Sequence, residues 1–288
     1  DREANIDKPR ARVVLLAKNN DGYVNIIKMV TESYVNGFYY RPRLDHALIE
    51  EFHKDLVCIL PSFSAETTLA LKDDDTEKAG QLLDWYHSLF GADCYLEVTS
   101  HPEIPDHEAL QKKIVSLSKK TGIPLLAQHD VYYLKPEDHL ARETMIKIQS
   151  GGVVDPMTDG GDGAPNFSFV SPSDMKERFT DHPEALAHSV HIADACTVVM
   201  EPGKTWYFPD YRIESGKSPD EELHDKAYAG VAWRGLSLDD ATLRERLDYE
   251  LSVIKMKGYA KYFLVVGDLL REARERKILT TIRGSVAG

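Results

Sequence analysis

The feature that most constrains the fold is an alternation of short apolar runs with longer amphipathic segments over the first half of the chain. The apolar runs predict strands at residues 12–17, 56–60, 94–99 and 124–128. The segments between them predict helices at residues 23–35, 45–53, 76–90 and 106–120. Strands that recur roughly every 35 to 45 residues, each followed by a helix, are typical of parallel βαβ units. We therefore expect an α/β barrel or open parallel sheet with its site at the carboxyl ends of the strands.

The last third of the chain follows a different pattern, because helical periodicity replaces the alternation. Helices are predicted at residues 221–234, 240–257 and 261–276. A glycine-rich stretch at 151–167 predicts a connecting loop, and a stretch with proline and glycine at 206–218 predicts a linker. A chain of 288 residues also exceeds the usual size of a single core. We expect two domains, covering residues 1–211 and 212–288.

The charge of the chain is unevenly distributed. The net charge is −12, and the first 211 residues carry 21 Lys and Arg against 34 Asp and Glu. From Arg212 onward, 14 basic residues face 13 acidic ones. Phosphate neutralisation requires Lys and Arg, so the first part would repel a duplex. Any DNA contact is expected in the C-terminal region or in sequence beyond this chain.

The cysteines and the hydropathy indicate the cellular compartment in which the protein is expected. Cys58, Cys94 and Cys196 lie far apart in sequence, and none forms a Cys-x-x-Cys pair. This usage argues against a zinc ribbon or a disulfide framework and predicts a protein of the reducing cytoplasm. Cys58 and Cys94 lie within apolar runs and are expected to be small buried hydrophobic residues. No apolar run approaches the ~20 residues that span a bilayer, so no membrane contact is expected.

Four stretches carry a family resemblance. Residues 13–25 read Val-Val-Leu-Leu-Ala-Lys-Asn-Asn-Asp-Gly-Tyr-Val-Asn, and residues 37–45 read Gly-Phe-Tyr-Tyr-Arg-Pro-Arg-Leu-Asp. Residues 122–138 read Gly-Ile-Pro-Leu-Leu-Ala-Gln-His-Asp-Val-Tyr-Tyr-Leu-Lys-Pro-Glu-Asp, and residues 249–288 form a helix pair that ends in Arg-Gly-Ser-Val-Ala-Gly. In this order they resemble the bacterial DNA polymerase III alpha subunits, the C-family replicases. The first three stretches are similar to the PHP (polymerase and histidinol phosphatase) domain of that family and the fourth to the start of its palm.

The resemblance covers nearly the whole chain and implies a fragment. It implies a PHP-type distorted β/α barrel that lacks its N-terminal strands, followed by a mainly helical region that begins the polymerase palm. The parent protein would be a DNA-directed DNA polymerase that extends primers with deoxynucleoside triphosphates. This fragment alone is expected to be inactive.

The Arg-Gly-Ser segment is the predicted nucleotide-binding site. Gly284 lets the backbone approach a ligand, Arg283 can pair with phosphate oxygens, and Ser285 adds a hydroxyl and an amide. The resemblance places this loop beside the incoming nucleotide. Ile282 departs from the family, which has a glycine there, and a β-branched residue does not readily take a positive φ. The resemblance implies two-metal phosphoryl transfer with Mg²⁺, whose carboxylate ligands would follow Gly288, so no catalytic residue is expected in this chain.

The resemblance also implies a largely dismantled metal site in the PHP part. Three of the family's metal ligands should fall within this chain, and the corresponding residues are Arg12, Ser62 and Tyr132 in place of His, Cys and His. An arginine puts a fixed cation where a metal ion would bind. The resemblance therefore predicts a structural or partner-docking domain rather than a phosphatase.

A residual metal site is the alternative, and its candidate ligands are Glu97, His101, His129 and Asp130. All four lie at or just past the predicted ends of two strands. We expect instead that Asp130 caps a loop, that the two histidines are solvated, and that no metal is bound.

Three functional hypotheses follow from these observations. The first is the polymerase fragment, whose parent would bind primer–template DNA and deoxynucleoside triphosphates. In the family the PHP domain lies near the proofreading exonuclease subunit, which is a candidate partner, and a sliding clamp would bind through regions outside this chain. The second hypothesis is a stand-alone PHP phosphoesterase. The third is a non-catalytic interaction module with an acidic surface for a basic partner.

Overall fold

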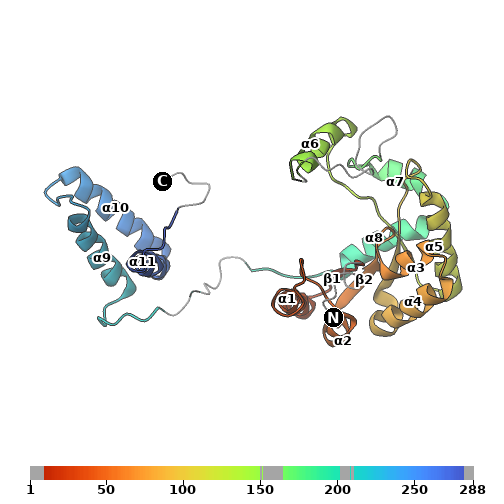
Figure 1. The fold of residues 1–288 in the computed structure, drawn as a ribbon, viewed down its shortest axis with the longest axis horizontal. Coiled ribbons are helices and arrows are strands. Elements are labelled where there is room, and N and C mark those ends of the chain that lie inside the picture. Colours follow the sequence, from red (N-terminus) through yellow and green to blue (C-terminus); the bar gives the residue numbers. More distant parts are fainter. Residues whose placement is uncertain (1–9, 150, 152–164, 202–207, 209–210, 282–288) are drawn as a thin grey trace. The chain divides into compact units, whose positions relative to one another are not determined.

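The computed structural model describes residues 10–149, 151, 165–201, 208 and 211–281. The chain divides into two compact units, Asp1–Met200 and Glu201–Gly288, which are described separately (Figure 1). The predicted domain boundary between residues 211 and 212 remains a prediction. The predicted Arg283-Gly284-Ser285 site, most of the glycine-rich stretch at 151–167, and residues 206, 207, 209 and 210 of the predicted linker lie outside the described residues.

The first unit is built on a four-stranded sheet with strand order β1-β2-β3-β4. The strands are β1 (Val14–Ala17), β2 (Leu56–Leu60), β3 (Cys94–Val98) and β4 (Leu125–Ala127), so all four predicted strands are confirmed. Strands β2, β3 and β4 are parallel, whereas β1 runs antiparallel to β2 with Val14 opposite Ile59. The expectation of an entirely parallel sheet was therefore wrong for β1. An apolar run predicts a strand but not its direction, because strand pairing depends on contacts between residues distant in sequence.

The described part of this unit contains eight α-helices. They are α1 (Asn20–Val35), α2 (His46–Phe52), α3 (Glu66–Lys72), α4 (Thr76–Phe90), α5 (His107–Thr121), α6 (His139–Gln149), α7 (Pro172–Arg178) and α8 (Pro183–Ala195). The predicted helices at 23–35, 45–53, 76–90 and 106–120 are confirmed within a few residues as α1, α2, α4 and α5. Short 3₁₀ turns occupy Gly91–Asp93 and Pro136–Asp138.

Side-chain caps explain why three of these helices begin where they do. The Asn19 side chain accepts a hydrogen bond from the Gly22 amide, Asp45 accepts one from Leu48, and Asp75 accepts one from Lys78. Such caps satisfy amides that have no partner within the helix. Helix α3 was missed because its N-cap is Ala65, which provides no side-chain cap, and because it has only seven residues.

The two faces of the sheet pack against different helices, as alternation along each strand requires. Leu56, Cys58 and Leu60 of β2 belong to the larger core cluster, to which α1 to α5 also contribute. Val57 and Ile59, on the opposite face, pack with Ile192 of α8. Figure 1 shows α8 on one side of the sheet and α3, α4 and α5 on the other.

The two buried cysteines lie side by side in this core. Cys58 and Cys94 are register partners across β2 and β3, and both are free thiols with no exposed surface. Burial raises the pKa of Cys58 well above its usual value. Both cysteines are small buried hydrophobic residues, which confirms the prediction made for them.

Gly22 sets the distance between α1 and the start of β2. A Cβ added at this position would lie 2.2 Å from the backbone oxygen of Asp55. No real Cβ approaches a backbone oxygen this closely, so only glycine allows α1 to approach the Asp55 backbone at this separation.

The second unit contains three helices in its described part, α9 (Pro219–Trp233), α10 (Ala241–Lys257) and α11 (Ala260–Glu275). All three were predicted. Ser218 caps α9 through a capping box with Glu221, and Gly258 ends α10 in the left-handed conformation. Helix α9 packs on α11. Across the described portion of the chain, no helix is both long and apolar enough to span a bilayer.

Candidate functional site

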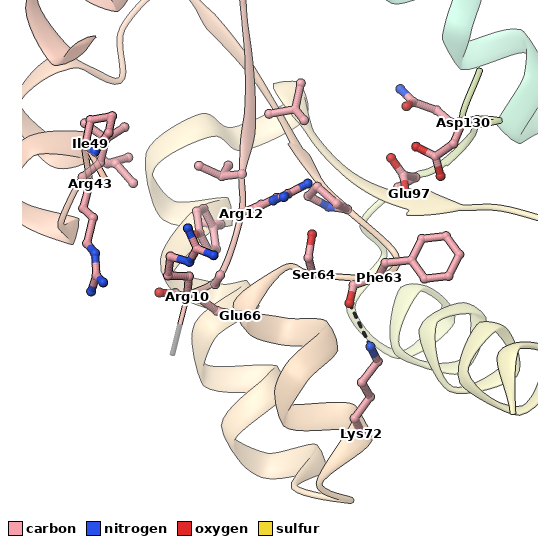
Figure 2. A pocket seen from close by; sticks show the side chains of 18 of the residues that line it. Arg10, Arg12, Arg43, Ile49, Phe63, Ser64, Glu66, Lys72, Glu97 and Asp130 are labelled. Atoms are coloured by element: carbon pink, nitrogen blue, oxygen red, sulfur yellow. Dashed lines mark hydrogen bonds between the residues drawn. The ribbon is translucent and has the colours of Figure 1, made fainter. Parts of the chain in front are cut away.

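The candidate site is a pocket where four strand ends meet. The carboxyl ends of the parallel strands β2, β3 and β4 share one edge of the sheet. The antiparallel direction of β1 brings its amino end to the same edge. The Arg12 amide, just before β1, donates a hydrogen bond of 2.8 Å to the Ser64 carbonyl, just after β2. A cavity of about 960 Å³ opens at this edge (Figure 2).

The deepest part of the site is a buried hydrogen-bonded group from two strand ends. The Glu97 carboxylate accepts hydrogen bonds from the Ser62 amide at 2.9 Å and from the Ser62 hydroxyl at 3.0 Å. The Ser62 hydroxyl also lies 2.9 Å from the Thr99 hydroxyl. Burial raises the pKa of Glu97, and the nearby charge of Asp130 adds to this effect. Ser62 stands at the position where the resemblance places a cysteine ligand, and both its hydrogen bonds to Glu97 go to the same carboxylate oxygen.

Two carboxylates of the pocket, Glu97 and Asp130, lie apart from Arg10, whereas Glu66 lies on the Arg10 side of the view in Figure 2. Figure 2 shows the Glu97 and Asp130 carboxylates together on one side and Arg10 on the other, with Arg12 between them in this view. Both arginines line the cavity, and neither guanidinium lies within 4.0 Å of a carboxylate oxygen of the described residues. The Asp130 carboxylate makes no hydrogen bond to a described residue, so the predicted loop cap is absent from this part of the chain.

Tyr132 lies in the same pocket, where the resemblance implies a histidine. Burial and the charge of Asp130 raise the pKa of its phenol. The Arg142 guanidinium lies 4.2 Å from the centre of its ring, at cation–π distance. A phenol beside an arginine therefore lies where the resemblance implies an imidazole ligand, and the three positions that the resemblance assigns to ligands hold Arg12, Ser62 and Tyr132.

The histidines form a separate cluster behind the pocket. The His101 side chain is fully buried, its Nδ1 lies 3.2 Å from the Glu103 carboxylate, and its ring stacks on His129 at 5.2 Å. His129 Nε2 donates to the Ser168 carbonyl at 2.9 Å, while its Nδ1 accepts from Arg178 at 3.3 Å. The expectation of solvated histidines was therefore wrong for His101, which is fully buried, whereas His129 is partly buried and both its ring nitrogens have protein partners.

Sequence reasoning missed His107, which joins this cluster from the start of α5. Its ring lies 5.6 Å from that of His101, and its Nε2 donates to the Thr99 carbonyl at 3.1 Å. Burial lowers the pKa of His107 and of His129, so both favour the neutral form. His107 lies on the same helical face as Leu110 and Ile114, and this spacing in the sequence could have predicted that it is buried.

These groups do not converge on a metal ion. Within the described ranges, no group of three or more His, Cys, Asp or Glu side chains is arranged to hold one. Glu97 and Asp130 lie together in the pocket, whereas His129 belongs to the cluster behind it and both its ring nitrogens have protein partners.

Comparison with known proteins gives two family matches in order along the chain. Residues 3–101 match the PHP domain, and residues 221–288 match the bacterial DNA polymerase III alpha NTPase domain. The DNA polymerase III subunit alpha of Borreliella burgdorferi is 32% identical over 100% of this chain and 25% of its own length. The corresponding subunit of Bacillus subtilis is 33% identical over 96% of this chain and 24% of its own length. That of Aquifex aeolicus is 30% identical over 98% and 25% respectively.

Proposed function

Because the chain belongs to the bacterial DNA polymerase III alpha subunit family and spans about a quarter of its relatives' length, we propose that it is part of a DNA-directed DNA polymerase. The observation that carries this proposal is the pair of family matches, the PHP domain followed by the polymerase III alpha domain, in one chain. In this proposal residues 1–211 are the PHP domain and residues 212–288 begin the palm. The whole protein would extend a primer on template DNA with deoxynucleoside triphosphates.

The part of this activity assigned to the present chain is nucleotide binding at Arg283, Gly284 and Ser285. An arginine can pair with two phosphate oxygens, and a glycine lets backbone amides approach them. In such polymerases Mg²⁺ ions neutralise the charge that develops during phosphoryl transfer. We assign their ligands to the sequence after Gly288. The chain described here then orients the triphosphate and leaves the chemical step to residues elsewhere.

The PHP part has a structural or docking role in this proposal. Two observations support it: Ser62 donates two hydrogen bonds to Glu97, and Arg12 places a permanent cation in the pocket. These residues do not suit a polymetal hydrolytic site, because a hydroxyl that donates to a carboxylate is not a thiolate ligand and a guanidinium repels metal ions. A proofreading exonuclease subunit is the proposed partner of this part. The sliding clamp would bind elsewhere on the whole protein.

Primer extension tests the proposal. The longer polypeptide that contains this chain should add nucleotides to a primed template with Mg²⁺, and the 288-residue chain alone should add none. The variant Arg283→Gln in the longer polypeptide should raise the KM for nucleotides roughly tenfold, as expected for the loss of a charged hydrogen bond. A longer polypeptide without activity, or an active isolated chain, would contradict the proposal.

The competing hypothesis of a PHP phosphoesterase has its own assay. Hydrolysis of a nitrophenyl phosphate by the 288-residue chain with added Mn²⁺ would support it. We expect no hydrolysis above the rate of the chain-free buffer, since Arg12, Ser62 and Tyr132 replace three ligands implied by the resemblance.

A further inference from the structure

We propose that the pocket at the strand ends binds a phosphate oxyanion directly through Arg10 and Arg12, without a metal ion. This inference concerns the first unit alone and does not depend on polymerase activity. Its basis is the arrangement of charge in the cavity, where Arg10 and Arg12 are present and no carboxylate of the described residues is paired with either of them.

The four cationic groups come from three segments of the chain and line the same cavity. Arg10 and Arg12 precede β1, while Arg43 precedes α2 and Lys72 ends α3, and all four line the pocket. Among the residues that the structure describes, no carboxylate oxygen lies within ion-pairing distance of Arg10 or Arg12. A guanidinium presents five N–H donors in a planar fork that matches two phosphate oxygens. Two such groups at one cavity form a recognition site for a tetrahedral anion.

The carboxylates of the pocket compete only partly for these arginines. Glu66 lies 2.8 Å from His46 Nε2, and Glu97 accepts two hydrogen bonds from Ser62. Burial of Glu97 favours its neutral form, which lowers the negative charge on that wall. Asp130 remains on the wall opposite Arg10 in Figure 2 and opposes an anion bound there. The anion is therefore expected on the Arg10 side of the cavity, away from Glu97 and Asp130.

Lys72 provides a further donor among the residues that line the pocket. Its ammonium donates to the Phe63 carbonyl at 2.9 Å. An ammonium has three donors, so this hydrogen bond leaves two for a ligand. The Lys72 contact also fixes the ammonium at the rim of the pocket, where Figure 2 places it close to Phe63 and Ser64.

The cavity is larger than a free phosphate ion requires. Its volume of about 960 Å³ is near the upper end of the usual range for small-molecule sites. Phe63, Tyr132 and Phe167 also line it, and aromatic rings can stack on a nucleobase. The candidate ligands are inorganic phosphate and a nucleoside monophosphate, and both carry the phosphate group that the arginines would bind.

Isothermal titration of the 288-residue chain tests the proposal, with inorganic phosphate and deoxyadenosine monophosphate as the two ligands. Each titration is run with untreated protein and with protein treated with EDTA, and all should show saturable binding that weakens as salt is added, since exposed charges are screened. Tighter binding of the nucleotide would assign an aromatic contact to the base. Equal affinities would assign the site to the phosphate group alone. Binding that disappears with EDTA, or that is absent at millimolar ligand, would overturn the proposal.

Two variants that replace an arginine with an uncharged glutamine test which residues bind the anion. Arg12→Gln and Arg10→Gln should each weaken phosphate binding roughly tenfold, the effect of removing a charged hydrogen bond. The matched control is Arg41→Gln, an exposed arginine near Arg43 that does not line the cavity, and its affinity should be unchanged. Circular dichroism and the thermal midpoint confirm that each variant is folded. Because either variant suffices, unfolding of one leaves the other as the test. Wild-type affinity in both folded variants would contradict the assignment.

Discussion

The two units differ in how much of their apolar surface they bury. In the first unit, Leu83, Cys58 and Leu96 are examples of a core that is almost fully excluded from solvent. In the described part of the second unit, only Val231, Ala260 and Leu264 are buried hydrophobic residues, and α10 buries none. Large side chains such as Trp233, Met256 and Leu269 are more than 60% exposed. Burial of apolar surface is the main driving force of folding, so the first unit has the larger intrinsic stability.

This difference also bears on the proposed function. A helical unit that leaves broad apolar faces uncovered is suited to packing against further protein. That is consistent with our proposal that residues 212–288 begin a larger palm domain. The first unit, in contrast, has a layered core of its own and can hold a pocket in fixed geometry.

The largest expected effect comes from the core of the first unit. Leu83→Ala removes a side chain with no exposed surface from α4 and should lower the free energy of unfolding by about 3 kcal/mol. The matched change in the second unit, Leu269→Ala, removes a side chain that is 65% exposed and should cost less than about 0.5 kcal/mol. Urea denaturation followed by circular dichroism measures both. Similar losses in the two variants would remove the contrast between the units.

The second expected effect tests the contact between α1 and the Asp55 backbone. Gly22→Ala introduces a Cβ against the Asp55 oxygen and should destabilise the first unit by about 2 kcal/mol, because backbone must move. Gly80→Ala is the control, since Gly80 lies within α4 and a Cβ there meets nothing within 4 Å. The control should be neutral or stabilising by about 0.5 kcal/mol, since alanine favours helix. Thermal unfolding distinguishes them, and a tolerated Gly22→Ala would show that α1 can shift.

A smaller effect is expected at the start of the second unit. Ser218→Ala removes the hydroxyl that caps α9 and should cost about 1 kcal/mol of helix stability. Amide exchange should speed up in the first turn of α9 while β2 and β3 are unaffected. Faster exchange throughout both units would mean that they unfold together, contrary to the comparison above.

The smallest expected effect is a pH dependence caused by Glu97. The fold raises the pKa of this buried carboxyl above 4.5, so the protonated form is favoured in the native state. Its contribution to stability is complete below the unfolded pKa and is lost as pH rises through the folded value. Glu97→Gln keeps the oxygen that accepts from Ser62 and cannot ionise. The stability of the wild type relative to this variant should fall as pH rises from about 4.5, and a constant difference would exclude the raised pKa.

Much of the fold was predictable because local chemistry determines it. The four strands follow from apolar runs, and Asn19, Asp45 and Asp75 mark helix starts in the sequence. The direction of β1 was not predictable, because strand pairing depends on contacts between residues distant in sequence. Helix α3 lacks a capping side chain and so gave no local signal.

The site was less predictable than the fold. The resemblance marked Arg12, Ser62 and Tyr132 as replaced ligands, and the strand ends indicated Glu97 and Asp130. Arg12, Tyr132, Glu97 and Asp130 all line one pocket. The burial of His101 and the partial burial of His129 were not foreseen, because both rings contact a segment distant in sequence, His101 through Phe167 and His129 through Ser168. The predicted contact at Arg283 remains a prediction.

Because Cys58 and Cys94 lie side by side in the core, their reaction with an alkylating reagent would report opening of the sheet. A thiol that is excluded from solvent does not meet an alkylating reagent, so these two sulfurs can be modified only in molecules whose sheet has opened. Cys196 is half-exposed and provides an internal reference that reacts without such an event. Comparing the alkylation rates of Cys58 and Cys94 with that of Cys196 would therefore measure how often the sheet opens. The measurement uses the natural cysteines and needs no engineered label.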